Sequence, residues 1–152
     1  MPLDIGTAAP DFILRNQAGA KISLGDLKGS KATIVFIPFP FTSTCTAELC
    51  QLRDGLAIFN KSNTRLVVIT THATSTNAEW ARQEGFEFDI LADYWPHGDV
   101  ARQYDAFDER FGFAKRVTYF LDADAIVRDV LASDVLGVVR DYDRYAEILA
   151  DY

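Results

Sequence analysis

Continuous runs of apolar and β-branched residues mark the first predicted strands. The sequence reads "ATIVFIPF" at 32–39 and "RLVVIT" at 65–70, and such runs are typical of strands buried on both faces of a sheet. A shorter strand is expected at 88–91, which reads "FDIL". Pro38 and Pro40 end the first strand, because proline has no N–H to donate to a neighbouring strand.

A helical period replaces these runs after the first strand. From Thr44 onward, apolar side chains recur every three or four residues and predict a single helix: Leu49, Leu52, Leu56 and Phe59. Further helices are expected at 75–85, 99–107 and 141–152, the last of them acidic and amphipathic. In the first of these three, Thr76 and Glu79 fit a capping box and Gly85 fits the C-terminal stop.

Two hairpins complete the pattern and define the fold class. Residues 11–14 and 21–24 flank a turn centred on Gly19, and 116–131 reads as a hairpin around "DADA". Strands that alternate with helices predict one α/β domain over 1–152, with a central mixed sheet flanked by helices and an N-terminal hairpin. A strand followed directly by a cysteine-bearing helix is also the element order of a thioredoxin-like fold.

Composition and charge narrow the function classes. The 152-residue chain is 49% apolar and carries a formal net charge of −7. This balance argues against a nucleic-acid-binding surface or a basic membrane-docking face, because both need clustered Lys and Arg. No apolar stretch approaches the roughly 20 residues of a spanning helix, and no secretory signal is expected. Two cysteines do not make a disulfide framework, so a reducing cytoplasm is the expected location.

Both cysteines lie in one stretch, "PFPFTSTCTAELC" (38–50). Cys45 falls in the first helical turn, where free backbone N–H groups and the helix dipole favour a thiolate. A cysteine pKa of about 8.5 can fall to roughly 3.5–7.5 in such places, and the thiolate is the nucleophile. The hydroxyls of Thr42, Ser43 and Thr44 could bond the sulfur or a ligand, or only cap the helix. A buried structural cysteine is the alternative interpretation.

Three motifs in order resemble the peroxiredoxin family. Pro38, Thr42 and Cys45 fit its Pro-x-x-x-Thr-x-x-Cys motif after an apolar strand, and "APDF" at 9–12 is similar to its N-terminal signature. Arg116, just before "VTYFLD", is placed like the active-site arginine of the family. The resemblance spans nearly the whole chain. The segments "DYWPHG" and "CTAELCQLRD" look most like the alkyl hydroperoxide reductase E subgroup of actinobacteria.

The resemblance implies a thiol peroxidase that needs no external cofactor. Cys45 would be the peroxidatic nucleophile, which attacks hydrogen peroxide or an organic hydroperoxide and becomes a sulfenic acid. Thr42 would orient the peroxide, and Arg116 would stabilise the thiolate and the charge on the leaving oxygen. Pro38 would shield the pocket. Thioredoxin, mycoredoxin or a low-molecular-weight thiol would be the reductant, and a homodimer is expected.

Cys50 cannot bond to Cys45 while the helix between them is intact. Five residues of regular helix place the two Cα atoms about 8–9 Å apart, whereas a disulfide needs roughly 7 Å or less. Cys50 also lies about 140° from the centre of the apolar side, by the 100° step of a helix. We therefore expect it to face solvent or a subunit contact.

The Cys-x-x-x-x-Cys spacing resembles a second group of the family, peroxiredoxin Q or bacterioferritin comigratory protein. That resemblance implies that Cys50 resolves the sulfenic acid as an intramolecular disulfide, after the first helical turns unwind. The alkyl hydroperoxide reductase E subgroup typically lacks this cysteine and relies on an outside thiol. The sequence combines two patterns, so a one-cysteine mechanism stays open.

For five polar or aromatic residues, a purely structural role is the alternative to a role in the site. Arg116 could begin a strand in solvent, and Glu48 could join an active-site network or only balance the helix dipole. Trp95 could line the pocket, form a subunit contact or cover an edge of the core. His72 and His97 match no metal-ligand spacing.

Two other functions are less favoured. A thioredoxin-type oxidoreductase would use Cys-x-x-Cys, which is two residues shorter than the spacing here. A protein that binds a metal through Cys45, Cys50 and a histidine would need a tighter ligand spacing.

Overall fold

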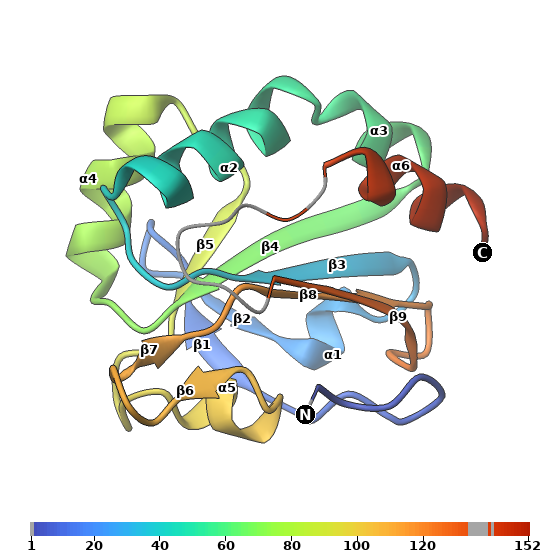
Figure 1. Ribbon diagram of the computed structural model, residues 1–152, viewed down its shortest axis with the longest axis horizontal. Coiled ribbons are helices and arrows are strands. Elements are labelled where there is room, and N and C mark those ends of the chain that lie inside the picture. The colour runs from blue at the N-terminus through green and yellow to red at the C-terminus, as the bar shows by residue number, and fades with distance from the viewer. Residues whose placement is uncertain (1, 134–139, 141) are drawn as a thin grey trace.

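The computed structural model describes residues 2–133, 140 and 142–152. A seven-stranded sheet with the order β2-β1-β5-β4-β3-β8-β9 runs through the molecule (Figure 1). Its strands are β1 (Ile13–Arg15), β2 (Lys21–Ser23), β3 (Lys31–Phe36), β4 (Thr64–Thr70), β5 (Asp89–Ala92), β8 (Val117–Leu121) and β9 (Val127–Ala132). The strands β3, β4 and β5 are parallel, and the other pairs are antiparallel. The predicted mixed sheet and both hairpins are confirmed.

Helices cover both faces of this sheet (Figure 1). They are α1 (Leu24–Leu27), α2 (Ser43–Asp54), α3 (Ala57–Lys61), α4 (Thr74–Glu84), α5 (Asp99–Gln103) and α6 (Asp143–Ala150). The helices α2, α3, α4 and α6 lie on one face, and α1 and α5 lie on the other. A small ribbon of β6 (Phe107–Asp108) and β7 (Phe113–Ala114) lies beside α5. None of the described helices is both long enough and apolar enough to span a bilayer.

The continuous apolar run of β3 is explained by a core on each side of the sheet. Ile34 and Phe36 join the cluster beneath α1 and α5, whereas Val35 and Ile37 join the cluster beneath α2 and α4. Successive side chains of a strand point to opposite faces, so a strand covered on both faces needs apolar residues at every position. The strand ends by Pro38, as predicted.

The single helix expected after Thr44 is two helices in the structure. The first helix, α2, ends at Asp54, and α3 begins at Ala57. A Cβ atom on Gly55 would lie 1.4 Å from the Tyr142 hydroxyl oxygen. The break therefore occurs where the chain leading into α6 packs against the helix end and leaves no room for a side chain.

The predicted capping box of the next helix is wrong. The helix α4 begins at Thr74 with Ala73 at the N-cap, and no side chain caps it. Glu79 instead accepts hydrogen bonds from Arg82 and Gln83, one turn further along the helix. The predicted stop is confirmed, because Gly85 adopts a left-handed conformation with φ of 71°.

Two other helix boundaries differ from the prediction. The helix expected at 99–107 ends at Gln103, because Asp105 takes a left-handed conformation with φ of 51° and Phe107 begins β6. The last helix covers Asp143–Ala150 of the expected 141–152, and Asp141 lies outside the described residues. Its apolar side is confirmed as buried: Tyr145, Ile148 and Leu149.

Gly98, immediately before α5, is expected to be intolerant of a side chain. Its φ is +70°, and a Cβ atom there would lie 2.2 Å from the Phe107 ring. The Arg102 guanidinium and the His97 ring pack against that ring, so it has little freedom to move. We expect Gly98→Ala to lower the free energy of unfolding by about 2–3 kcal/mol, the cost of the conformation plus overpacking. Urea denaturation measures this change.

Gly112→Ala is the matched control for that substitution. Gly112 has a similar φ of +78°, but nothing lies within 4 Å of the position that a Cβ atom would take there. The substitution Gly112→Ala should therefore lower the free energy of unfolding by only about 1 kcal/mol, which is the cost of the conformation alone. Equal losses of unfolding free energy in Gly98→Ala and Gly112→Ala would show that contact with Phe107 adds nothing to the cost at Gly98.

Candidate active site

The loop between β3 and α2 places the predicted nucleophile at the end of the parallel strands. Thr42 is the N-cap residue of α2, and Cys45 lies in the first turn with its side chain fully buried. The Thr42 hydroxyl donates to the Phe39 carbonyl at 2.8 Å and does not cap the helix. Since this bond uses its only proton, the hydroxyl oxygen can accept a hydrogen bond from a ligand.

A pocket of about 230 Å³ opens above the Cys45 sulfur. Its lining combines four predicted site residues with three others: Pro38, Thr42, Cys45 and Arg116, and Phe39, Thr44 and Phe113. The two phenylalanine rings form much of the apolar wall, with centroids 6.2 Å apart. The pocket therefore offers a thiol, a cation and a hydroxyl within an apolar enclosure.

Arg116 joins the nucleophile to a buried carboxylate. Its Nη2 donates to the Cys45 sulfur at 3.1 Å, and its Nη1 donates to Glu48 Oε1 at 3.0 Å. The Arg116 side chain is only 3% exposed, so the alternative of a strand start in solvent is wrong. Its Nε has no hydrogen-bond partner among the described residues. The Cys45 sulfur therefore accepts a charge-assisted hydrogen bond from a buried guanidinium.

Glu48 belongs to the buried network, which settles the choice left open by the sequence. Besides Arg116, it binds Arg140, which donates from Nε and from its backbone N–H to Glu48 Oε2 at 2.9 and 2.8 Å. The Arg140 Nη2 lies 2.5 Å from Glu48 Oε1. Burial alone would raise the pKa of Glu48, but the bonds and charge of Arg140, with the charge of Arg116, hold it below its usual value of 4.5.

Sequence reasoning missed Arg140, Phe39 and Phe113. Arg140 also donates to the Phe36 carbonyl at 2.8 Å, so it ties the end of β3 to α2. No motif around position 140 indicates this role, since a lone arginine before a helix is a common surface residue. Phe39 carried a weak signal, because an aromatic between two prolines in a candidate loop is available to line a site.

Cys50 does not line the pocket. It is half-buried on the side of α2 that packs against α4, and its thiol donates to Glu84 Oε2 at 3.6 Å. It keeps part of its surface exposed, as expected, but it also contacts a second helix of the same chain, and a subunit contact stays a prediction. Burial, and to a smaller extent Glu84, raises the pKa of Cys50, although Arg53 opposes this. Both cysteines are free thiols.

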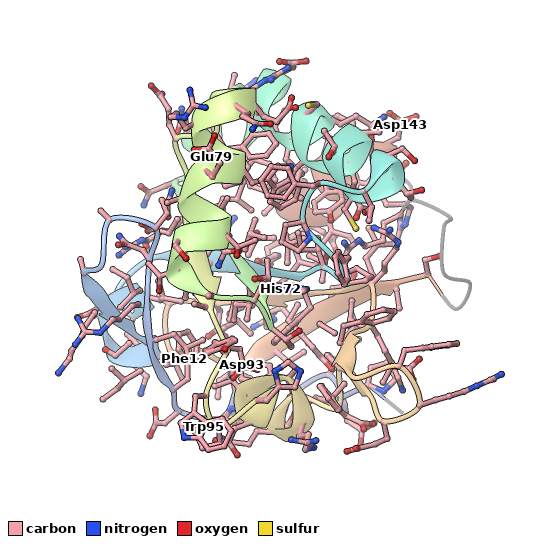
Figure 2. All side chains as sticks on the ribbon, turned by 90° about the vertical axis from the view of Figure 1, so that its left-hand side faces the viewer. Phe12, His72, Glu79, Asp93, Trp95 and Asp143 are labelled. Atoms are coloured by element: carbon pink, nitrogen blue, oxygen red, sulfur yellow. The ribbon has the colours of Figure 1, made fainter. Side chains whose placement is uncertain are left out.

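Figure 2 labels two further residues that the sequence left open, Trp95 and His72. Trp95 lies at the surface with 83% of its area exposed and is not among the described residues of the pocket. It therefore neither walls the pocket nor covers the core, and a subunit contact stays a prediction. His72 packs on Phe39 with ring centroids 4.4 Å apart. No group of three or more metal-ligating side chains occurs within the described parts of the chain.

The thioredoxin-like arrangement and the Cys45–Arg116 site agree with a known family. The model of the AhpC/TSA family matches residues 5–130. The chain therefore belongs to this family and is a peroxiredoxin, a thiol-dependent peroxidase.

Individual relatives support this assignment. Alkyl hydroperoxide reductase E of Mycobacterium tuberculosis is 38% identical over 149 residues, which cover 97% of each chain. Peroxiredoxin Bcp of Escherichia coli is 28% identical over 135 residues, or 85% of each chain. The solved structure of peroxidoxin BcpB from Mycobacterium tuberculosis superposes with a TM-score of 0.85 at 28% identity, over 97% of this chain and 95% of the other. The predicted resemblance to the E subgroup is confirmed.

Proposed function

We propose that Cys45 is the peroxidatic nucleophile that reduces hydrogen peroxide or organic hydroperoxides. The observation that carries this proposal is the 3.1 Å hydrogen bond from Arg116 to the Cys45 sulfur at the base of the pocket. The thiolate attacks the terminal peroxide oxygen, the O–O bond breaks, and an alkoxide or hydroxide leaves and takes up a proton. Cys45 is thereby oxidised to a sulfenic acid.

The other pocket residues orient the peroxide for this displacement. Thr42 accepts the hydrogen of the peroxide O–H group, because its own proton is bound to Phe39. Arg116 supplies further N–H groups for the oxygens as charge moves onto the leaving group. Pro38 is buried and forms part of the wall beside the sulfur. Because the donors are fixed by the network of Glu48, they need little reorganisation during the reaction.

Cys50 then resolves the sulfenic acid as an intramolecular disulfide. Both cysteines lie in the continuous helix α2, so its first turns must unwind before the two sulfurs meet. Thioredoxin, mycoredoxin or a low-molecular-weight thiol would reduce the disulfide. The alternative is a one-cysteine cycle in which an external thiol attacks the sulfenic acid directly.

One equivalent of peroxide followed by intact-mass measurement and peptide mapping tests both cysteines together. We expect a Cys45–Cys50 disulfide in the wild type, seen as the loss of two hydrogens. In the Cys50→Ser variant we expect a sulfenic or sulfinic acid on Cys45. An oxidised Cys45 beside a free Cys50 thiol in the wild type would contradict the resolving role. An unmodified Cys45 after peroxide is consumed would contradict the nucleophile assignment.

A further inference from the structure

Cys50 faces a carboxylate that lies outside the peroxide pocket. Its Sγ is 3.6 Å from Oε2 of Glu84, the last residue of α4. The thiol is half-buried between the two helices and packs against the core cluster that includes Leu49 and Leu52. A nucleophilic side chain and a carboxylate thus meet at a helix–helix contact that the peroxide chemistry does not use.

The nearby cation forms its hydrogen bonds with groups other than this carboxylate. The charged groups that face Cys50 are Arg53 and Asp54 on α2 and Glu84 on α4. The Arg53 Nε donates to Asp54 Oδ1 at 2.9 Å, and its Nη1 donates to the backbone carbonyl of Glu84 at 2.5 Å. Arg53 lies close enough to attract the Glu84 carboxylate, but its hydrogen bonds go to Asp54 and to the Glu84 backbone, and the carboxylate accepts the Cys50 thiol. Burial and this carboxylate together raise the pKa of Cys50.

The contact matters because a thiolate, and not a thiol, attacks a sulfenic acid. For resolution, the Cys50 S–H bond loses its proton to solvent, and the Cys50 sulfur forms an S–S bond to Cys45. The S–O bond of the sulfenic acid breaks, and the departing hydroxide takes a proton and leaves as water. Cys50 is oxidised as Cys45 is reduced from the sulfenic to the disulfide level, so no further oxidant is needed.

We propose that Glu84 restrains Cys50 by holding its thiol as a hydrogen-bond donor, and thereby sets the competition between Cys50 and an external thiol for oxidised Cys45. This inference rests on the resolving role of Cys50 proposed above. Glu84 is a positioning residue, which acts through Cys50. It gives the sulfenic acid a longer lifetime, during which an external thiol can attack it.

The part of α2 that carries Cys50 is tied to its neighbours on both sides of the cysteine. Glu48, which lies between the two cysteines, is held by Arg116 and Arg140. Arg53 binds the Glu84 carbonyl one turn beyond Cys50. These contacts hold the part of α2 that carries Cys50. The first turn has no side-chain cap, and Arg116 and Trp80 bind it at Cys45 and Thr46. We expect the contacts around Cys50 to keep Glu84 beside it when the first turn of α2 unwinds.

The variant Glu84→Gln tests the inference through the pH dependence of disulfide formation. The wild type and the variant are mixed with one equivalent of peroxide between about pH 6 and pH 9, and the disulfide is quantified by quenched mass spectrometry. We expect faster disulfide formation at neutral pH, by about threefold for each unit by which the pKa of Cys50 falls. The thiolate fraction rises tenfold per unit, and the lower nucleophilicity offsets part of that gain. The gain should persist across this range, because the pKa of Cys50 in the wild type is raised above its usual value of 9.0.

Glu79→Gln is the matched control, since it removes the same charge from the exposed side of the same helix, where Glu79 binds Arg82. Glu79→Gln should leave the rate of disulfide formation unchanged at every pH. A slower or unchanged rate for Glu84→Gln at neutral pH would overturn the inference.

Alkylation of Cys50 separates this inference from the proposed function. In the Cys45→Ser background, iodoacetamide reacts with Cys50 alone, and its rate against pH reports the thiolate. Glu84→Gln should shift this profile to lower pH, and an unshifted profile would overturn the inference even where the disulfide forms normally. If the profile shifts but the wild type forms no disulfide, the restraint on the thiol is supported and the resolving role of Cys50 is wrong.

Discussion

Replacing Cys45 by serine is expected to lower the rate constant for peroxide reduction by at least about 10³-fold, because it removes the nucleophile of the reaction. A serine hydroxyl stays protonated at neutral pH and does not form the sulfenic acid on which turnover depends. The Arg116 donor and the pocket remain, but the sulfur that Arg116 contacts is gone. The measurement is the loss of hydrogen peroxide and of an organic hydroperoxide in the presence of dithiothreitol.

Cys50→Ser is the control for that variant. Cys50 lies outside the pocket, so the first oxidation of Cys45 should keep its wild-type rate. Dithiothreitol can replace Cys50 in the reduction of the sulfenic acid, so turnover should continue. Circular dichroism should show that both variants are folded. A Cys45→Ser protein with full peroxidase activity would show that the chemistry takes place elsewhere.

Glu48→Gln is expected to destabilise the fold by about 3–5 kcal/mol, because it leaves two buried guanidinium groups without their anion. The Glu48 carboxylate is 3% exposed and binds Arg116 and Arg140 together. An amide can accept one of these hydrogen bonds but carries no charge. Urea denaturation at pH 7 gives the change in the free energy of unfolding.

Glu79→Gln is the matched control for this prediction as well. Glu79 also binds an arginine, but that pair is exposed on α4 and is screened by solvent. Its loss should leave the urea midpoint nearly unchanged. Equal effects of the two substitutions would show that the buried network adds no more stability than a surface pair.

The stability of the wild type should also depend on pH through Glu48. The pKa of Glu48 is lowered in the folded state from its usual value of 4.5. Its contribution is therefore present above about pH 4.5 and is lost as the pH falls towards the folded-state pKa. The difference in unfolding free energy between the wild type and Glu48→Gln should narrow in acid. A constant difference from pH 7 to about pH 3 would contradict this assignment.

The positions of Cys45 and Thr42 could be predicted because they follow short-range rules. A buried strand, two prolines and a helix start place Cys45 and Thr42 in one loop whatever the rest of the chain does. The assembly of Glu48, Arg116 and Arg140 could not be predicted in the same way. Helical periodicity gives the direction of the Glu48 side chain, but only the packing of β8 and of the chain before α6 brings the two arginines to it.

Cys50 shows a similar limit of sequence reasoning. The 100° step placed it correctly away from the centre of the apolar side of α2. The helical step could not reveal that α4 packs beside Cys50 and brings Glu84 to its thiol. The break at Gly55 was hidden for the same reason, because the close approach of Tyr142 involves residues far away in the sequence.

The active site is assembled from parts of the chain that are far apart in sequence. Arg116 is 71 residues from Cys45, and Arg140 is 92 residues from Glu48. Contacts with such large sequence separation form late in folding, since the loop-closure entropy must be overcome before they add stability. During synthesis, a chain that has emerged only as far as α4 already contains both thiols but neither arginine. The reactive form of Cys45 therefore arises only when the fold is nearly complete.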